Sequence, residues 1–315
     1  PQALTNAISR YKGDLSQSNI FDIENAAGNA ISRLEAEQVQ RDLILSLNRN
    51  VALNQGKLDP DRDIKIDLGN AWDVSDDLVL GASLNWGYDE EYRNKNQIKR
   101  SIGNPSDNFS ESERTVYELR KTLAIVLGAE YAEDNTIQLS HYVIQNDADE
   151  ASITSGFSSN NPATENRPRV NYDTRLEERE LELTQITGSH RLGKFSPVPA
   201  LEMLSFDWFY SDAQATTNVP NATSFSGSID RNTSPETPFI SQSSTAGQFE
   251  FLALEDNVES WGGRVELPID IDGRELTVSG GWWNSEKTRE YYGRPLGGVS
   301  AGCVAGEPSR FYRCV

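Results

Sequence analysis

Carboxylates at every second position are the first candidates for chemistry in this sequence. Glu178, Glu180 and Glu182 follow this spacing, which places all three on one face of an extended strand. A pair of acids acting as a catalytic couple is one interpretation. The other is a polar wall that faces a water-filled or plugged interior, and it explains all three side chains. We adopt the second interpretation and place these glutamates on a lumen face.

The remaining reactive residue types form no catalytic or metal-binding pattern. His141 and His190 belong to no recognisable Ser/His/Asp or Cys/His arrangement, so we assign them structural or interfacial roles. The run DPDRDIKID, which starts at Asp59, begins like a calcium loop, but Ile64 occupies the sixth position, where an EF-hand needs glycine. A looser cation site is the alternative there. The sequence predicts no enzyme, no cofactor and no metal centre.

The two cysteines, Cys303 and Cys314, flank the stretch GCVAGEPSRFYRC near the C-terminal end. This spacing fits a local disulfide in an oxidising compartment such as the periplasm or the cell surface. Two unrelated reduced thiols are the alternative. We expect residues 293–315 to form an extracellular loop that carries this disulfide.

The bulk composition excludes some classes of protein. The chain has 315 residues, 37% of them hydrophobic, and a formal net charge of −19. Nucleic acid is excluded as a partner because phosphate binding requires clustered Lys and Arg. No apolar run approaches the ~18 residues that a membrane helix needs. A transmembrane β-strand needs only ~10 residues with every second one apolar, so the composition still allows a barrel.

Alternation with a period of two recurs along the chain and predicts strands. In residues 78–88 we assign Leu78, Leu80, Leu84 and Trp86 to a lipid face, and Val79, Gly81, Ser83 and Asn85 to the lumen. Similar segments occur at residues 64–72, 116–131, 137–143, 177–190, 204–211, 258–269 and 275–285. We therefore predict about eight strands in four hairpins across residues 59–292.

The connections between these segments alternate in length. Turns within hairpins are mostly tight, whereas residues 89–115, 146–176 and 212–248 read as long polar loops between hairpins. Short turns at one end, long loops at the other, and aromatic residues toward strand ends are typical of outer-membrane barrels. Residues 1–58 are expected to be an extracellular loop segment with one amphipathic helix near residues 30–48.

Several stretches resemble the barrel region of TonB-dependent receptors. LSLNRNVALNQGKLDPDRDIKIDLGNAW (Leu45–Trp72) is followed by LVLGASLNWGYDEEYRNK (Leu78–Lys95). YDTRLEERELELTQITGSHRLG (Tyr172–Gly193) is similar to that family in its HRLG turn, after which the aromatic-rich LSFDWFYSDAQATTNVP (Leu204–Pro220) returns. The resemblance implies a 22-stranded barrel with a plugged lumen. The chain shows neither a plug nor a TonB box, so we expect an all-β, antiparallel, up-and-down piece of a larger transmembrane barrel wall.

The same resemblance implies a function and a location. A receptor of this family would take up a scarce nutrient, such as a metal chelate, an oligosaccharide or a vitamin, across the outer membrane of a Gram-negative bacterium. Its partners would be outer-membrane lipid and lipopolysaccharide, TonB through a plug domain, and the small nutrient. Candidate ligand contacts are Tyr92, Trp283, Tyr291 and Tyr292. A passive porin and a secreted, soluble β-sandwich binding module are the alternatives.

Overall fold

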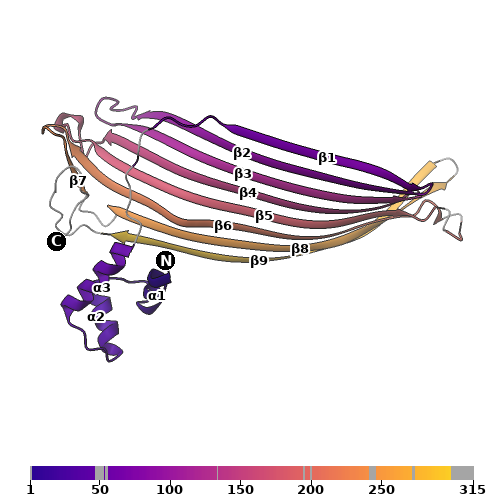
Figure 1. Cartoon of the computed structure of the whole chain (residues 1–315), viewed down its shortest axis with the longest axis horizontal. Coiled ribbons are helices and arrows are strands. Elements are labelled where there is room, and N and C mark those ends of the chain that lie inside the picture. The colour runs from indigo at the N-terminus through magenta and orange to yellow at the C-terminus, as the bar shows by residue number, and fades with distance from the viewer. Residues whose placement is uncertain are drawn as a thin grey trace. The chain divides into compact units, whose positions relative to one another are not determined.

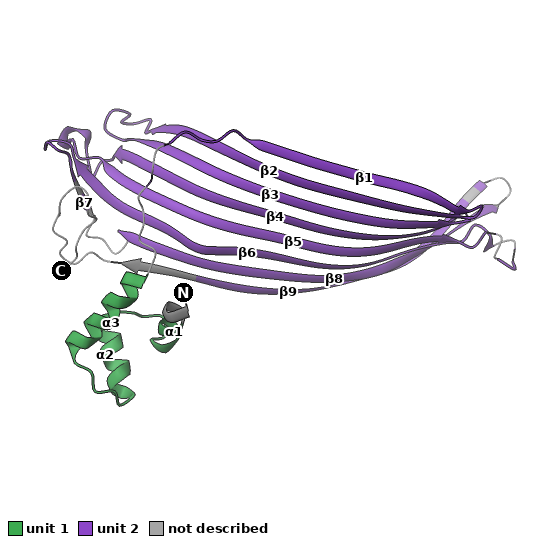
Figure 2. Ribbon diagram, in the orientation of Figure 1, with its two compact units in different colours: residues 1–52 green, residues 53–315 purple. Residues whose placement is uncertain are grey.

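The computed structural model describes residues 2–46, 53, 56–132, 134–193, 196–198, 201–240, 246–271 and 274–298. The chain divides into two compact units, Pro1–Ala52 and Leu53–Val315 (Figure 2). The first unit is helical, and the second is built from one β-sheet. In the described part of the chain, no helix combines the length and the apolar character needed to cross a membrane.

The helical unit contains α1 (Gln2–Arg10), α2 (Gln17–Ala26) and α3 (Arg33–Ser46). The prediction of one helix within a loop was therefore wrong: α3 covers the predicted helix, but two more helices pack with it around Tyr11, Ile20 and Ala36. Ala7, Ile8 and Tyr11 follow helical spacing in and just after α1, but the run is short, and α2 shows a weaker period. A Ser32–Glu35 capping box begins α3, with the Ser32 backbone N–H donating to Glu35 at 2.7 Å.

One buried acid holds the first two helices together. Glu24 of α2 is only 6% exposed. Its carboxylate accepts hydrogen bonds from Arg10 Nη2 at 2.6 Å, from Tyr11 Oη at 2.8 Å and from the Asn29 amide. These bonds hold the pKa of Glu24 below its usual range, with the Arg10 bond contributing most. The carboxylate is therefore a structural link, because its hydrogen-bonding capacity is used inside the unit.

The second unit is a single antiparallel sheet in which sequence neighbours are spatial neighbours (Figure 1). Its long strands are β1 (Arg62–Ser75), β2 (Leu78–Arg100), β3 (Phe109–Tyr131), β4 (Asn135–Phe157), β5 (Arg169–Arg191), β6 (Ser205–Asp230), β8 (Gly247–Ile271) and β9 (Arg274–Gly298). Short β7 (Thr237–Ile240) pairs only with β6. The up-and-down antiparallel sheet predicted from the alternation is thus confirmed.

The strands are much longer than the sequence pattern indicated. Residues 89–115, 146–176 and 212–248 were expected to be loops, but most of them continue the strands, and the connection after β2 is only residues 101–108. In these stretches both faces carry polar residues, so the apolar alternation disappears although backbone pairing continues. Likewise, residues 293–298 belong to β9 rather than to a loop. Cys303 and Cys314 lie outside the described residues.

Strand register determines which residues share a face, because directly paired residues point to the same side of an antiparallel sheet. Leu84 pairs with Leu68 on one side and Ile125 on the other. The face that carries Leu84 is called here the band face, and the opposite face, which carries Ser83 and Asn85, the polar face. The alternation predicted for residues 78–88 is therefore continued across the neighbouring strands.

The apolar residues of the band face form a continuous belt, the apolar band, on all eight long strands. It lies toward the sheet end that carries the connections after β1, β3, β5 and β8 (Figure 1). It comprises Ile64, Ile66, Leu68, Trp72, Leu78, Leu80, Leu84, Trp86, Leu123, Ile125, Leu127, Tyr131, Ile137, Leu139, Val143, Ile186, Phe206, Trp208, Tyr210, Trp261, Val265, Leu267, Ile269, Leu276, Val278 and Trp282. Much of it is open: Leu68 is 60% exposed and Trp282 is 49% exposed.

Glycines on the band face make room for its aromatic rings. A Cβ at Gly188 would lie 2.3 Å from Nε1 of Trp208, and a Cβ at Gly263 would lie 2.8 Å from the Trp282 ring. Each ring thus lies over a neighbouring glycine, an arrangement that shields glycine backbone within a sheet. The Trp208 indole N–H donates to His190 Nε2 at 3.0 Å, so the polar tip of this ring has a partner.

Candidate ligand-facing surface

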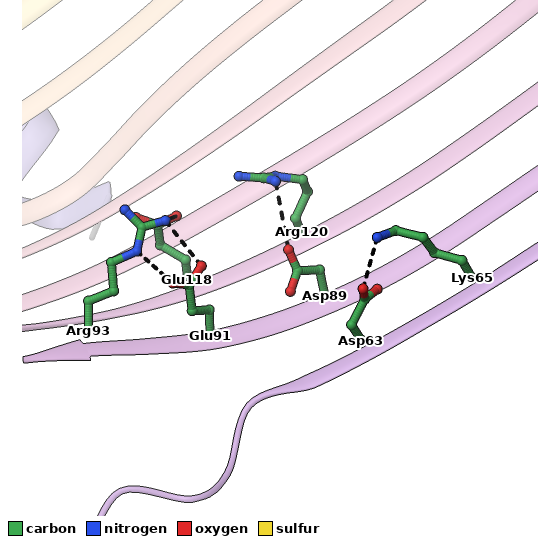
Figure 3. Close-up of polar contacts among 7 residues, drawn as sticks. All are labelled: Asp63, Lys65, Asp89, Glu91, Arg93, Glu118 and Arg120. Carbon is green, nitrogen blue, oxygen red and sulfur yellow. Dashed lines mark hydrogen bonds and ion pairs between the residues drawn. The ribbon is translucent and has the colours of Figure 1, made fainter.

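Charged side chains of opposite sign cover the polar face of β1, β2 and β3. Arg93 donates to Glu91 and reaches across the strand pair toward Glu118, and these two carboxylates raise the pKa of the guanidinium. Figure 3 shows four pairs: Lys65–Asp63 at 2.8 Å, Arg93–Glu91 at 2.8 Å, Arg93–Glu118 at 3.5 Å and Arg120–Asp89 at 3.7 Å. Since all are partly exposed, each pair contributes little stability by itself.

Ion pairs continue on the polar face of the later strands. Arg114 contacts Glu150 at 2.5 Å, and Arg175 contacts Glu250 of β8 at 3.4 Å. The second contact spans β6, because both residues pair with Ala222.

Asp256 of β8 contacts two cations of β9 on this face. Arg289 of β9 donates to it through two nitrogens, each at 2.5 Å, and Lys287 lies 3.4 Å away. The Arg289 hydrogen bonds lower the pKa of Asp256 to about 2. A bidentate contact of this kind fixes both orientation and distance, so this part of the sheet presents an ordered pattern of charge.

A hollow of about 710 Å³ opens nearer the apolar band. Phe209, Trp283 and Arg264 line it, together with Asp207, Ser279 and Thr136. Phe209 and Trp283 both pair with Gly262, one from each neighbouring strand. Most of the lining belongs to the polar face, and Trp208 and Trp282 of the apolar band also line the hollow. A Cβ at Gly262 would lie 3.0 Å from the Phe209 ring, so this ring lies over the glycine.

The four aromatic residues predicted to contact a ligand do not form one site. Trp283 and Tyr291 belong to the polar face and are 70% and 65% exposed. Tyr92 pairs with Tyr117, and Tyr292 pairs with Ala253. Both partners lie on the band face, so the two tyrosines lie there as well. Tyr92 packs against Tyr117, with ring centroids 4.9 Å apart. Adjacent residues in a strand alternate between faces, so Tyr291 and Tyr292 cannot line the same surface.

The placement of Glu178, Glu180 and Glu182 on the lumen face was wrong. Glu182 pairs with Val143, and Glu178 pairs with Asp147, which puts all three glutamates on the band face beyond the apolar residues. The polar face of this strand carries Leu181 and Leu183 instead. The alternation within one strand shows which residues share a face, but not which side of the sheet that face lies on. The register with the neighbouring strands decides this.

The remaining sequence candidates have local structural contacts. His141 Nδ1 lies 3.0 Å from Thr184 Oγ1, and His190 accepts the Trp208 hydrogen bond described above. Asp61 accepts the backbone N–H of Tyr92 at 2.9 Å, just beyond the Arg62–Glu90 pair that ends the β1–β2 ladder. In the described ranges, no three His, Cys, Asp or Glu residues come together as a possible metal site.

Sequence reasoning missed Phe209, Arg264 and the small residues that form the hollow. Their signal in the sequence is a pair of glycine doublets on neighbouring strands. Gly262-Gly263 of β8 pairs with Trp283 and Trp282, and Gly280-Gly281 of β9 pairs with Val265 and Arg264. Comparison of the chain with models of known protein families found no match, and neither did comparison with curated proteins. The case for any function therefore depends on the residues and the fold.

Proposed function

We propose that this chain is part of the wall of an outer-membrane β-barrel of the TonB-dependent receptor type. Such a receptor takes up a scarce nutrient, such as a metal chelate, an oligosaccharide or a vitamin. The observation that carries the proposal is the apolar band: a continuous, exposed belt on one face of an antiparallel sheet whose other face is polar. A barrel wall needs this distribution because one face meets lipid and the other meets water.

A soluble sandwich would treat the same face differently. It would bury the apolar residues against a second sheet about 10 Å away. The structure, over the ranges it describes, has one sheet, and band residues such as Leu68 and Val278 are more than half exposed. Exposed patches of this extent mark contact with a membrane or with another protein. Hydrocarbon covers the whole belt without requiring a partner protein.

The edges of the sheet favour a piece of a larger wall. β1 and β9 are the two ends of the strand order and do not pair with each other. Unpaired backbone groups are costly in hydrocarbon, so spanning strands occur in closed barrels. On this proposal, further strands pair with β1 and β9 and complete the barrel.

The length of the strands fits a wall that continues beyond the membrane. β2 to β5 each contain 23 residues, whereas about 10 are enough to cross the hydrocarbon. The strand parts beyond the apolar band, called here the outer extension, carry charged residues on both faces. They would project outward and surround an aqueous vestibule lined by the ion pairs of the polar face.

The membrane part of the proposal is tested by spin labels placed along β2 in lipid. Labels at residues 80, 82 and 84 should be accessible to oxygen, which partitions into hydrocarbon, and labels at residues 81, 83 and 85 should not share this preference. The full chain should also fractionate with the outer membrane. An even-numbered face shielded from both oxygen and polar quenchers would indicate a protein core and would refute the barrel wall.

The uptake part needs a separate test. Deletion of TonB in the producing bacterium should abolish growth on the transported nutrient when that nutrient is limiting. Unchanged growth would contradict energised uptake and would favour the passive porin.

A further inference from the structure

The hollow on the polar face has an unusual lining for a wall that faces water. Trp283 is 70% exposed, and its neighbours on the same face of β9 are Gly281 and Ser285. Phe209 lies across Gly262 from it. An indole left open to water loses the benefit of its large apolar area. Two aromatic side chains in the lining of one concavity are therefore suited to a ligand that offers an apolar face of its own.

Polar groups lie in the same hollow as the two rings. Asp207 accepts a hydrogen bond from Ser189 Oγ at 2.6 Å, and Arg264 is paired with Glu266 at 2.5 Å. Ser279 and Thr136 add hydroxyl groups. Because the Arg264 charge is already paired with a carboxylate, the lining offers hydroxyl, carboxylate and guanidinium hydrogen bonds without an excess of positive charge.

We propose that this hollow binds a ring of a neutral sugar; the inference rests on the proposed uptake function and selects the oligosaccharide among its possible nutrients. A pyranose has one face of C–H groups that can stack on an indole, and its edge carries hydroxyl groups that both donate and accept hydrogen bonds. The volume of about 710 Å³ lies within the usual range for small-molecule sites. A flat apolar ligand would form no hydrogen bond with the hydroxyl groups of Ser279 and Thr136.

Two tryptophans on neighbouring strands provide a matched pair of variants. Trp283 belongs to the polar face and lines the hollow, whereas Trp261 belongs to the apolar band and is not among the lining residues. Calorimetric titration of the full chain in detergent with maltotriose, cellotriose and xylotriose should detect binding of at least one sugar. Trp283→Ala should weaken that binding about ten-fold or more, whereas Trp261→Ala should leave it within two-fold. Ser279→Phe should also weaken binding, because it fills the hollow without removing an indole.

Two results would overturn the sugar site: no binding of any of the three sugars by the unsubstituted protein, or equal effects of the two alanine variants. Quenching by brominated lipid separates this failure from failure of the barrel wall. If Trp261→Phe removes part of the lipid quenching and Trp283→Phe does not, the wall proposal stands even when no sugar binds. If neither variant changes the lipid quenching, the wall proposal fails as well.

Discussion

Arg and Lys are divided unequally between the two faces of the outer extension. The polar face carries Lys95, Lys99, Arg114, Arg120, Arg175, Arg179, Lys287 and Arg289, and its acids are interleaved with them. The band face carries Glu90, Glu111, Glu113, Asp147, Asp149, Glu178, Glu180, Glu182, Asp212, Glu255, Glu259, Glu286 and Glu290. The cations with described side chains there are Arg62, Arg100 and Lys121. Much of the net charge of −19 is therefore on one face.

This difference shows that polar character alone does not define the role of a surface. On the polar face, charges of opposite sign meet across strands and set a fixed pattern, as between Asp256 and Arg289. On the band face, several acids bond to amides or hydroxyls instead, as Glu178 does with Asn218 at 2.7 Å. An unneutralised acidic face repels anions and stays hydrated, which suits the part of the sheet that we propose to lie outside the membrane.

The largest expected effect compares the two faces within the apolar band. Leu84→Arg should destabilise the protein by about 2–4 kcal/mol if this part of the band lies near the bilayer midplane. Ser83→Arg is the matched control on the polar face and should cost much less, because its side chain reaches water. Urea-dependent unfolding from lipid vesicles measures both. Equal costs for the two variants would contradict the assignment of the faces.

A second comparison uses glycines on opposite faces. Gly188→Ala on the band face forces the Trp208 ring to move and breaks its bond to His190, at a cost of about 1–3 kcal/mol. At Gly87 on the polar face, a Cβ would lie 2.5 Å from the hydroxyl oxygen of Thr122, which rotates away. Gly87→Ala should therefore change stability by less than about 0.5 kcal/mol. The same unfolding assay applies, and a larger cost at Gly87 than at Gly188 would refute this account of ring packing.

Removal of the Trp208 hydrogen bond alone should have a smaller effect. Trp208→Phe keeps an aromatic ring over Gly188 but leaves His190 Nε2 without its donor. The expected loss is about 1 kcal/mol. Unfolding of this variant in the His190→Ala background is the control, since the second substitution should remove most of the penalty. Full additivity of the two substitutions would show that the bond contributes nothing.

The smallest expected effect is a difference between the two faces in the pH at which their aspartates take up protons. Burial raises the pKa of Asp149, and burial together with nearby Glu178 raises that of Asp147, whereas Arg289 lowers the pKa of Asp256 to about 2. On acidification Asp147 and Asp149 should take up protons first. Their ionised forms destabilise the folded protein, and this destabilisation disappears as the pH falls through their raised pKa values. The stabilising contribution of Asp256 is complete above its unfolded pKa of about 3.9 and is lost as the pH falls from there through about 2.

Carboxyl carbon NMR of labelled aspartate in nanodiscs, from pH 7 to pH 2, measures this order. Arg289→Gln should return the Asp256 titration toward the normal range and leave Asp147 unchanged. Titration of Asp256 before Asp147 in the unsubstituted protein would reverse the expected distinction between the faces.

The predictions from sequence succeeded where one face of a strand is apolar. Residues 78–88 show their period because Leu and Trp alternate with Gly, Ser and Asn, and the same holds for residues 116–131. They failed where both faces are polar, as in residues 146–157 of β4, because antiparallel backbone bonds form without any apolar signal. The helical unit was underpredicted for a related reason: its small core draws on only a few residues from each of three short helices.

The sequence by itself determined the antiparallel sheet, since a period of two with tight turns predicts strands paired in hairpins. It also determined which residues of one strand share a face. Only the tertiary structure decided which faces of different strands join, because register depends on pairing between segments far apart in the chain. The register places Glu178, Glu180 and Glu182 on the band face. It also pairs both Phe209 and Trp283 with Gly262, and it puts Tyr291 and Tyr292 on opposite faces.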